Sequence, residues 1–440
     1  MFKIKNYFDE DFIFLKEENV INKIILLIYS LYPIFLIVGT AISELATIFI
    51  CIYFLYLYFF KKEKILNKGL FIILITIYFS LLINLIFSNN FSNSLARNIF
   101  FIKYIIFVLG TFTFISKKKF RISFLYKVWA IIFIIFAIDM FIQFFLGKNI
   151  IGIESPLNLH RVSGFMGDEL KAGSILLSFS LISSCALINS KKYKNIGLFL
   201  FIFFLSAIFI SGDRSNFIKS LILFFLILFV LDNKLKSRLF VLLTILFAFI
   251  FLIISNYKTF ENRYKNDIFS SLSSYNFNLF KYIQSTEYGK VYHTGLVVFQ
   301  NNKFFGVGNK NFRLLCETSE MEKFLIKNNI QYRKNLIQEK FEEKYRCNTH
   351  PHQISIEILS EHGLFGFLIF LFILIIFIKQ NILIVLKKKD ILLTCQFLVI
   401  LINFTPILPS GSFFTSFNAT IFWTNMSLIY CFIYLNKKNT

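Results

Sequence analysis

The sequence predicts an all-α, polytopic membrane protein with about 12 transmembrane helices and one long periplasmic loop that carries short helices. Three observations predict this fold class. Of the 440 residues, 56% are hydrophobic and 16% are charged, whereas a soluble chain carries roughly 25% charged residues. The apolar residues form unbroken runs, many of them long enough to cross a hydrocarbon core of about 30 Å. The charges gather in short clusters between these runs.

The large number of basic residues suggests a nucleic-acid partner, but their positions along the chain argue against one. A net charge of +22 in a soluble protein would indicate nucleic acid. Here the basic residues cluster between apolar runs, which is the pattern of a membrane topology and argues against nucleic-acid binding. The clusters lie at 61–64, 117–121, 191–194, 234–238, 387–389 and 437–438.

The apolar runs predict twelve spans and their orientation. With the N-terminus cytoplasmic, every basic cluster falls on the cytoplasmic side, as does the C-terminus. We expect a multi-pass protein of the bacterial inner (cytoplasmic) membrane, whose first span serves as an uncleaved insertion signal. The spans are expected at about 22–39, 41–60, 69–87, 99–115, 123–146, 172–189, 195–211, 216–231, 238–255, 355–378, 390–408 and 417–435.

One long polar segment divides the chain into three parts. Residues 1–255 carry the first nine spans, 256–354 form a large periplasmic loop, and 355–440 carry the last three spans. Loops of this length are usually functional. The stretch from Ser319 to Lys344 has a helical pattern.

The six cysteines fall into two groups. Cys316 and Cys347 both lie in the loop, where the periplasm is oxidising, so a disulfide between them is favoured over two free thiols. The other four lie in apolar runs, where cysteine usually behaves as a small hydrophobic residue. Those four are Cys51, Cys185, Cys395 and Cys431.

The stretch His350-Pro351-His352-Gln353 is the strongest candidate for chemistry. A metal site is disfavoured, because no Cys, Asp or Glu cluster at ligand spacing accompanies the histidines. An imidazole titrates near neutral pH, so His352 could act as a general base towards a hydroxyl. The alternative is a polar turn that only begins the tenth span, and composition alone does not separate the two.

Two further polar segments are expected on the same side of the membrane. Arg214 lies in Ser211–Asn216 between two spans, where an arginine usually faces a cavity or an anionic partner. Its fork suits phosphate oxygens, although an ion pair with Asp213 or Glu169 is the alternative. Arg161 offers a second such fork. The segment Phe304–Phe312 contains Gly-Val-Gly and is interpreted as a structural turn, because it lacks the context of a nucleotide-binding loop.

Together these motifs resemble the O-antigen ligase/polymerase superfamily of bacterial membrane glycosyltransferases. The most specific element is His352-Gln353, nine residues, then Gly363 and Gly366. Ser-Gly-Asp-Arg at 211–214, Arg-Val-Ser-Gly at 161–164 and the Gly-Val-Gly turn also look like this family. The chain departs from it where members carry a loop arginine, because Lys290 stands there. Either Lys290 supplies the charge or Arg263 reaches in from elsewhere.

The resemblance implies an O-antigen ligase. Such an enzyme would transfer polysaccharide from undecaprenyl pyrophosphate to a sugar hydroxyl of lipid A–core at the periplasmic face. His352 would be the general base, and Arg214, Arg161 and Lys290 would bind the pyrophosphate. Because the donor already carries an activated leaving group, no cofactor and no metal is expected, and one-step displacement would invert the anomeric carbon.

Other functions stay open on the sequence. An O-antigen polymerase would use the same donor with a second lipid-linked glycan as acceptor, and a protein O-oligosaccharyltransferase is a third member of the superfamily. From another class, a transporter or lipid flippase could also have twelve spans and intramembrane charges. It would not explain a long loop that ends in His-Pro-His.

Overall fold

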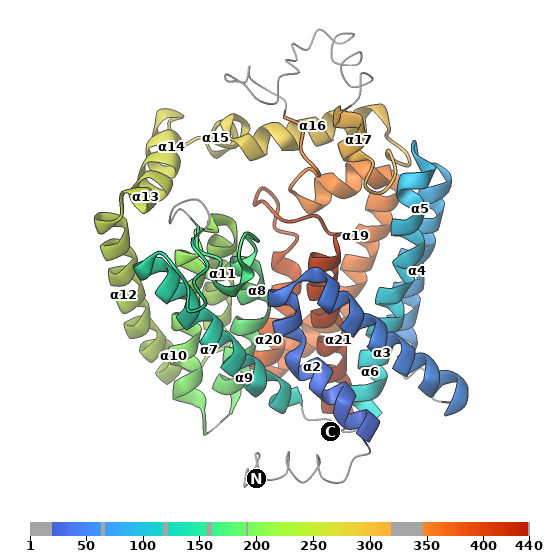
Figure 1. Cartoon of the computed structure of the whole chain (residues 1–440), viewed down its shortest axis with the longest axis horizontal. Coiled ribbons are helices and arrows are strands. Elements are labelled where there is room, and N and C mark those ends of the chain that lie inside the picture. Colours follow the sequence, from blue (N-terminus) through green and yellow to red (C-terminus); the bar gives the residue numbers. More distant parts are fainter. Residues whose placement is uncertain are drawn as a thin grey trace.

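The computed structural model is all-helical and describes residues 20–62, 67–117, 122–155, 161–190, 192–317 and 346–438. Long helices stand side by side as a bundle, and shorter helices lie across one end of it (Figure 1). The bundle helices are α2 (Val20–Val38), α3 (Thr40–Phe60), α4 (Lys68–Ile86), α5 (Phe91–Phe100), α6 (Ile102–Lys117), α7 (Ile122–Leu146), α8 (Ala172–Ile175), η2 (Leu176–Ser180), α9 (Leu181–Asn189), α10 (Lys194–Ile210), α11 (Arg214–Leu228), α12 (Asn233–Asn256), α19 (Ile354–Lys388), α20 (Ile391–Ile402) and α21 (Ser416–Lys438).

Aromatic side chains fill the interior of the bundle. Trp129 and Phe133 on α7 and Phe179 on η2 are fully buried. The rings of Trp129 and Phe179 meet edge-on with 4.9 Å between their centroids, a favoured aromatic geometry. Large buried rings of this kind pack neighbouring helices against one another.

The structure confirms an all-helical, multi-pass membrane protein. Eight helical segments of the described residues are long and apolar enough to cross a membrane: 20–38, 40–60, 68–86, 91–116, 124–146, 172–189, 233–256 and 354–388. Helices α10 and α20 are apolar but shorter, with 17 and 12 residues. Each of the twelve predicted spans overlaps helix in the structure, although the eleventh, 390–408, is helical only to Ile402. A count of twelve membrane crossings stays a prediction.

Two of the predicted boundaries were wrong. The fourth span was expected to begin at about residue 99, whereas α5 begins at Phe91 with Asn90 as its N-cap. The tenth span was expected at 355–378, whereas α19 continues to Lys388 and has non-helical backbone at Gly363. Sequence pattern missed the first because α5 is a polar helix whose Ser94 and Asn98 are buried by tertiary contacts.

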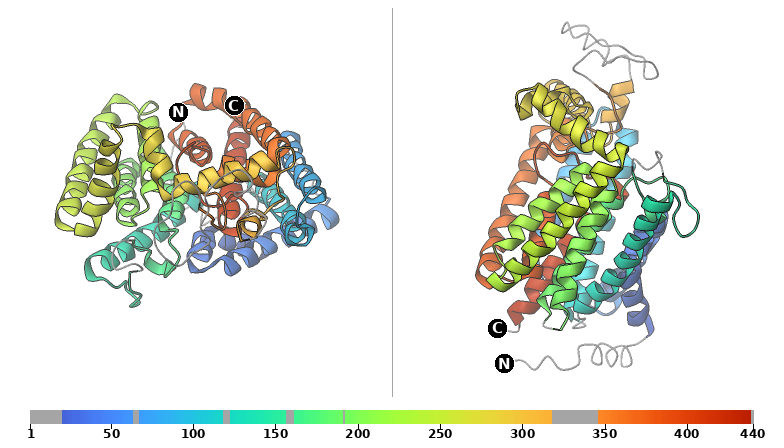
Figure 2. Two further views of the ribbon diagram at one scale, coloured as in Figure 1. Left: turned by 90° about the horizontal axis from the view of Figure 1, so that it is seen from above. Right: turned by 90° about the vertical axis from the view of Figure 1, so that its left-hand side faces the viewer.

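The segment between α12 and α19 forms a layer of short helices over one end of the bundle. It contains α13 (Lys258–Phe260), η3 (Glu261–Ser270), α14 (Ser271–Ser274), α15 (Leu279–Ser285), α16 (Glu287–Asn301) and α17 (Phe312–Glu317). Seen from above, α15 and α16 cross over the middle of the bundle (Figure 2). The predicted helix at 319–344 lies outside the described residues. The three-part division of the chain stays a prediction.

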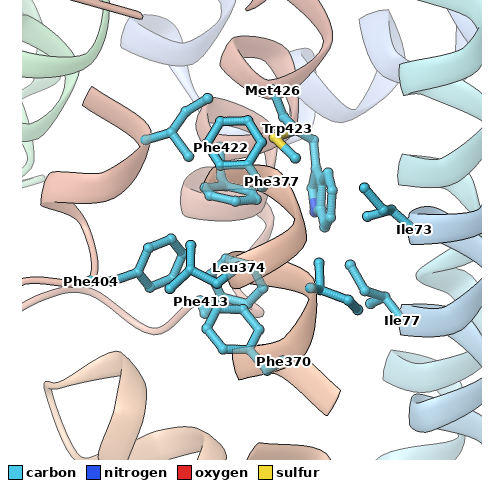
Figure 3. Close-up of a pocket in the computed structure, with 12 residues that line it drawn as sticks. Ile73, Ile77, Phe370, Leu374, Phe377, Phe404, Phe413, Phe422, Trp423 and Met426 are labelled. Carbon is cyan, nitrogen blue, oxygen red and sulfur yellow. The ribbon is translucent and has the colours of Figure 1, made fainter. Parts of the chain in front are cut away.

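An apolar pocket lies inside the bundle between α4, α19, α20 and α21 (Figure 3). Its walls include Ile73, Phe370, Phe413 and Trp423. Phe413 belongs to the connection between α20 and α21, and its backbone N–H donates to the carboxylate of Glu357 over 2.8 Å. The pocket therefore adjoins the polar residues described next.

Candidate functional site

The two glycine-containing motifs of the sequence lie against each other. Helix α19 breaks at Gly363, where φ is 65° and ψ is −168°. The turn at 303–308 fits into this break, because Val307 N donates to Ser360 O over 3.0 Å and Gly308 N to Glu361 O over 2.8 Å. A Cβ on Gly306 would lie 2.4 Å from the backbone carbon of Glu361. Only glycine permits this approach and the positive φ.

A set of asparagines connects this junction to α4 and α5. Asn84 on α4 donates to Phe305 O over 3.0 Å and to Glu361 O over 2.9 Å. Asn309 donates to Asn98 on α5 over 2.7 Å. The Asn84 side chain thereby satisfies two backbone carbonyl groups of the junction. The junction is therefore a rigid support for the residues that begin α19.

His352 lies immediately before α19, in a conformation that the helix start imposes. Gln353 is the N-cap of α19, and its side chain accepts from Ile356 N over 2.7 Å. His352 adopts a positive φ of 55°, which is uncommon for residues other than glycine and often marks a functional site. The half-buried ring lies 4.0 Å from that of His350 and 5.4 Å from that of Tyr288 on α16, centroid to centroid.

The environment of His352 favours the neutral imidazole. Burial lowers the pKa of His352 from 6.5 to about 4, and the nearby His350 and Arg346 act in the same direction, whereas Glu357 acts to raise it. Among the described residues, no hydrogen-bond partner reaches a ring nitrogen of His352. At neutral pH the ring can therefore accept a proton from a bound hydroxyl.

Three arginines gather at the start of α11. Arg161 Nη2 lies 3.7 Å from Asp213 Oδ2. Arg214 Nη1 donates to Arg263 O over 2.9 Å and lies 3.4 Å from Asp267. Arg263 Nη2 donates to Gly212 O over 2.7 Å. The predicted alternative partners of Arg214 were Asp213 and Glu169, but Asp267 in the loop takes that position.

The arginine cluster retains unused donors and excess positive charge. Burial lowers the pKa of Arg263, and the charges of Arg214 and Arg161 lower it further. The Nε atoms of Arg161 and Arg263 are buried without a hydrogen-bond partner among the described residues. Three guanidinium groups that repel one another and keep free N–H donors are suited to an anion with several oxygens.

Local contacts explain why Arg161 reaches α11. Gln143 on α7 accepts from the backbone N–H groups of Ser163 and Gly164 over 3.1 and 2.7 Å, which fixes the segment that follows Arg161. Gly173 on α8 packs so closely that a Cβ there would lie 2.9 Å from Asp213 Cβ. The start of α8 is thereby held against the N-cap of α11.

Lys290 pairs with an acidic residue of its own helix. Its Nζ is 3.3 Å from Glu287 Oε1 on the same helix, α16. The structure therefore brings Arg161 and Arg214 together with Arg263. Of the two explanations that the sequence left open for the missing loop arginine, the geometry favours Arg263, which comes from η3 at the start of the loop.

Residues 409–410, in the connection between α20 and α21, contact both helix α11, which begins at Arg214, and His352. Pro409 O accepts from Ser215 Oγ over 2.6 Å and from Lys219 Nζ over 2.8 Å, both on α11. The next residue, Ser410, donates its backbone N–H to His352 O over 2.8 Å. Sequence reasoning missed this segment, because nothing in its composition marks it beyond two prolines and a glycine.

Neither the metal nor the disulfide prediction is decided. No group of three His, Cys, Asp or Glu side chains that could hold a metal ion occurs among the described residues, and a metal-free mechanism stays a prediction. Cys347 is disulfide-bonded. The side chain of Cys316 lies outside the described residues, so the pairing with Cys316 stays a prediction. Cys51, Cys185, Cys395 and Cys431 are free and buried.

The fold and these motifs define a class, a polytopic membrane protein whose half-buried histidine and arginine cluster lie at one end of a helical bundle. The O-antigen ligase family model matches residues 199–371, from α10 into α19. Residues 199–371 are therefore similar to the O-antigen ligase family. Arg214, Arg263, Lys290 and His352 lie within the matched segment, and Arg161 precedes it. No curated protein matches the chain.

Proposed function

We propose that this protein is an O-antigen ligase, which transfers polysaccharide from undecaprenyl pyrophosphate to a sugar hydroxyl of lipid A–core. The observation that carries the proposal is the link through residues 409–410. One peptide segment contacts Ser215, next to Arg214, and also contacts His352. A leaving-group site and a base must be held at fixed separation for such a transfer.

In this proposal His352 is the general base. The oxygen of the acceptor hydroxyl forms a bond to the anomeric carbon of the donor, and its proton passes to the imidazole of His352. The bond from the anomeric carbon to the pyrophosphate oxygen breaks, and its electron pair leaves with the lipid pyrophosphate. A single displacement inverts the anomeric configuration. The low pKa of His352 supports this role, because the ring is neutral before reaction.

Arg161, Arg214 and Arg263 would hold the pyrophosphate. Their unused N–H donors suit its oxygens, and their charge would stabilise the negative charge that develops on the leaving group. No metal or other cofactor is needed for this step in the proposal, because the arginines supply the positive charge. In the proposal Lys290 has a smaller role than the arginines, since its Nζ pairs with Glu287 on the same helix.

The proposal places this end of the bundle in the periplasm, with both chain ends in the cytoplasm. The basic clusters of the sequence support that orientation, because Lys387 and Lys388 form the last turn of α19, which begins beside His352. Positive residues are retained on the cytoplasmic side. The substrates would then meet the site from the outer leaflet of the inner membrane.

A gene deletion complemented with wild type or His352→Ala tests the function in the bacterium. For a ligase, His352→Ala leaves lipid A–core without O-chains, and lipid-linked polymer accumulates. For a polymerase, lipid A–core carries single repeats. Unchanged lipopolysaccharide in the deletion strain itself would exclude both and favour another class, such as a transporter.

A further inference from the structure

A buried ion pair lies next to His352, and the mechanism above does not use it. The side chains of Lys310 and Glu357 are 6% and 1% exposed, and Lys310 Nζ lies 3.5 Å from Glu357 Oε1. Ser412 contacts both groups through its hydroxyl. Phe413 N donates to the other carboxylate oxygen over 2.8 Å. Each oxygen of Glu357 thus has a partner.

A buried ion pair is an expensive way to stabilise a fold. Removing two charges from water costs several kcal/mol per ion, and apolar replacements of similar volume are often as stable. Such a pair can instead specify one arrangement of the chain. Here it joins the turn at Lys310, the first part of α19 and the connection at 412–413, three segments that are far apart in the sequence.

The connection at 410–413 is held to the start of α19 at both of its ends. Ser410 N donates to His352 O over 2.8 Å, and Phe413 N donates to Glu357 Oε2. Glu357 lies in the first turn of α19, and its charge acts on the ring of His352. Displacing the Glu357 carboxylate would release residues 412–413 from α19. The connection at 410–413 would then no longer hold His352 in place.

We propose that Glu357, paired with Lys310, is a positioning residue for His352. It holds residues 410–413 against the start of α19, so that the imidazole keeps one place relative to the arginine cluster. Its negative charge also stabilises the imidazolium that forms when His352 takes the acceptor proton. This inference rests on the proposed function, because it needs His352 to be the base.

Glu357→Gln separates charge from shape. The amide keeps an oxygen that accepts from Phe413 N and a side chain of the same size, but it loses the charge and the second oxygen, which accepts from the Ser412 hydroxyl. We expect kcat to fall about tenfold and both KM values to change less than about twofold, since small displacements at a reacting group act on the chemical step. Glu357→Ala removes the support as well, and kcat should fall about a hundredfold. Glu154→Gln, an exposed residue paired with Lys148, is the control.

The activity is measured per folded protein, in proteoliposomes that contain the purified chain, undecaprenyl-pyrophosphate-linked glycan and lipid A–core. A thermal melt accompanies each variant. Lys310→Met leaves Glu357 without its partner and should lower the melting temperature. The double variant Lys310→Met/Glu357→Gln should regain stability without regaining kcat. A purely structural pair would instead regain both.

The outcomes distinguish this inference from the proposed function. If Glu357→Gln has wild-type kcat and KM but His352→Ala is inactive, the inference about Glu357 is wrong and the proposed function is still supported. An active His352→Ala variant overturns both. If Glu357→Gln does not give folded protein, Ser412→Ala tests the inference instead, because it removes the hydroxyl that contacts both Lys310 and Glu357. A fall in its kcat at constant KM supports the inference, and an unchanged kcat overturns it.

Discussion

The backbone N–H of Ser410 donates a hydrogen bond to the carbonyl oxygen of His352 over 2.8 Å. This bond joins the connection before α21 to the residue before α19, and the neighbouring Pro409 carbonyl is bound to α11. The distance between the candidate base and the arginine-bearing helix is therefore set by one segment of main chain.

Replacing Ser410 by proline tests this bond, because proline has no N–H to donate. We expect Ser410→Pro to lower the transfer rate by about tenfold or more, as the histidine loses its support. Ser410→Ala is the matched control. The Ser410 hydroxyl is buried and has no hydrogen-bond partner among the residues that the structure describes, so its removal should leave the rate near that of wild type. Equal rates for the two variants would show that the bond is unimportant.

The pH dependence of kcat should follow the low pKa of His352. A general base works in its neutral form, which is present above its pKa. Because burial lowers that pKa from 6.5 to about 4, activity should persist as the pH falls through 6 and decline only near 4. A profile of kcat against pH in proteoliposomes measures this. A decline centred near 6.5 would indicate a solvated imidazole and contradict the assigned environment.

Arg263 and Lys290 should differ in their effect on donor binding. Arg263→Ala removes a guanidinium from the cluster with Arg161 and Arg214, and hydrogen bonds to charged groups contribute about 1.5–3 kcal/mol. We expect the KM for the lipid-pyrophosphate donor to rise about tenfold or more. Lys290→Ala should change it less than about threefold, because Glu287 already pairs with Lys290. The reverse order would restore the assignment that the sequence favoured.

Gly306 and Gly363 should tolerate no side chain. A Cβ at Gly306 would lie 2.4 Å from Glu361, one at Gly363 would lie 2.4 Å from Phe304 O, and both residues have positive φ. We expect each alanine variant to lose about 2 kcal/mol or more of stability. Gly147→Ala is the control. Gly147 has a φ of +78°, but no atom lies within 4 Å of a Cβ there, so this variant should lose only the backbone contribution to stability, about 1 kcal/mol. Thermal melts in detergent rank the three, and equal melting temperatures would contradict the close packing.

The helices were predictable because hydropathy dominates in a membrane chain. Every apolar run in the prediction became a helix, since a backbone in hydrocarbon must satisfy its own hydrogen bonds. The polar helix α5 was missed, because its helix depends on contacts between Asn98 and Asn309 that no local pattern contains. The break at Gly363 was also hidden inside a continuous apolar run.

The candidate site was predictable only where the residue type itself indicates chemistry. His352, Arg161 and Arg214 were found because imidazole and guanidinium groups are unusual beside apolar runs. Arg263 could not be ranked above Lys290 from spacing, because which of them reaches Arg214 depends on how η3 packs on the bundle. Glu357 and Ser410 act through contacts with distant segments, and these contacts arise only on folding.

The central claim is that His352 takes the proton of the acceptor hydroxyl, and a comparison of His352→Gln with His350→Gln tests it most directly. Both variants keep a polar side chain of similar size in the half-buried pair, but only one removes the proposed base. With saturating donor and acceptor in proteoliposomes, we expect His352→Gln to lower kcat by about a thousandfold, within the range of general base catalysis. His350→Gln should stay within about tenfold of wild type. A His352→Gln variant within tenfold of wild type would contradict the account.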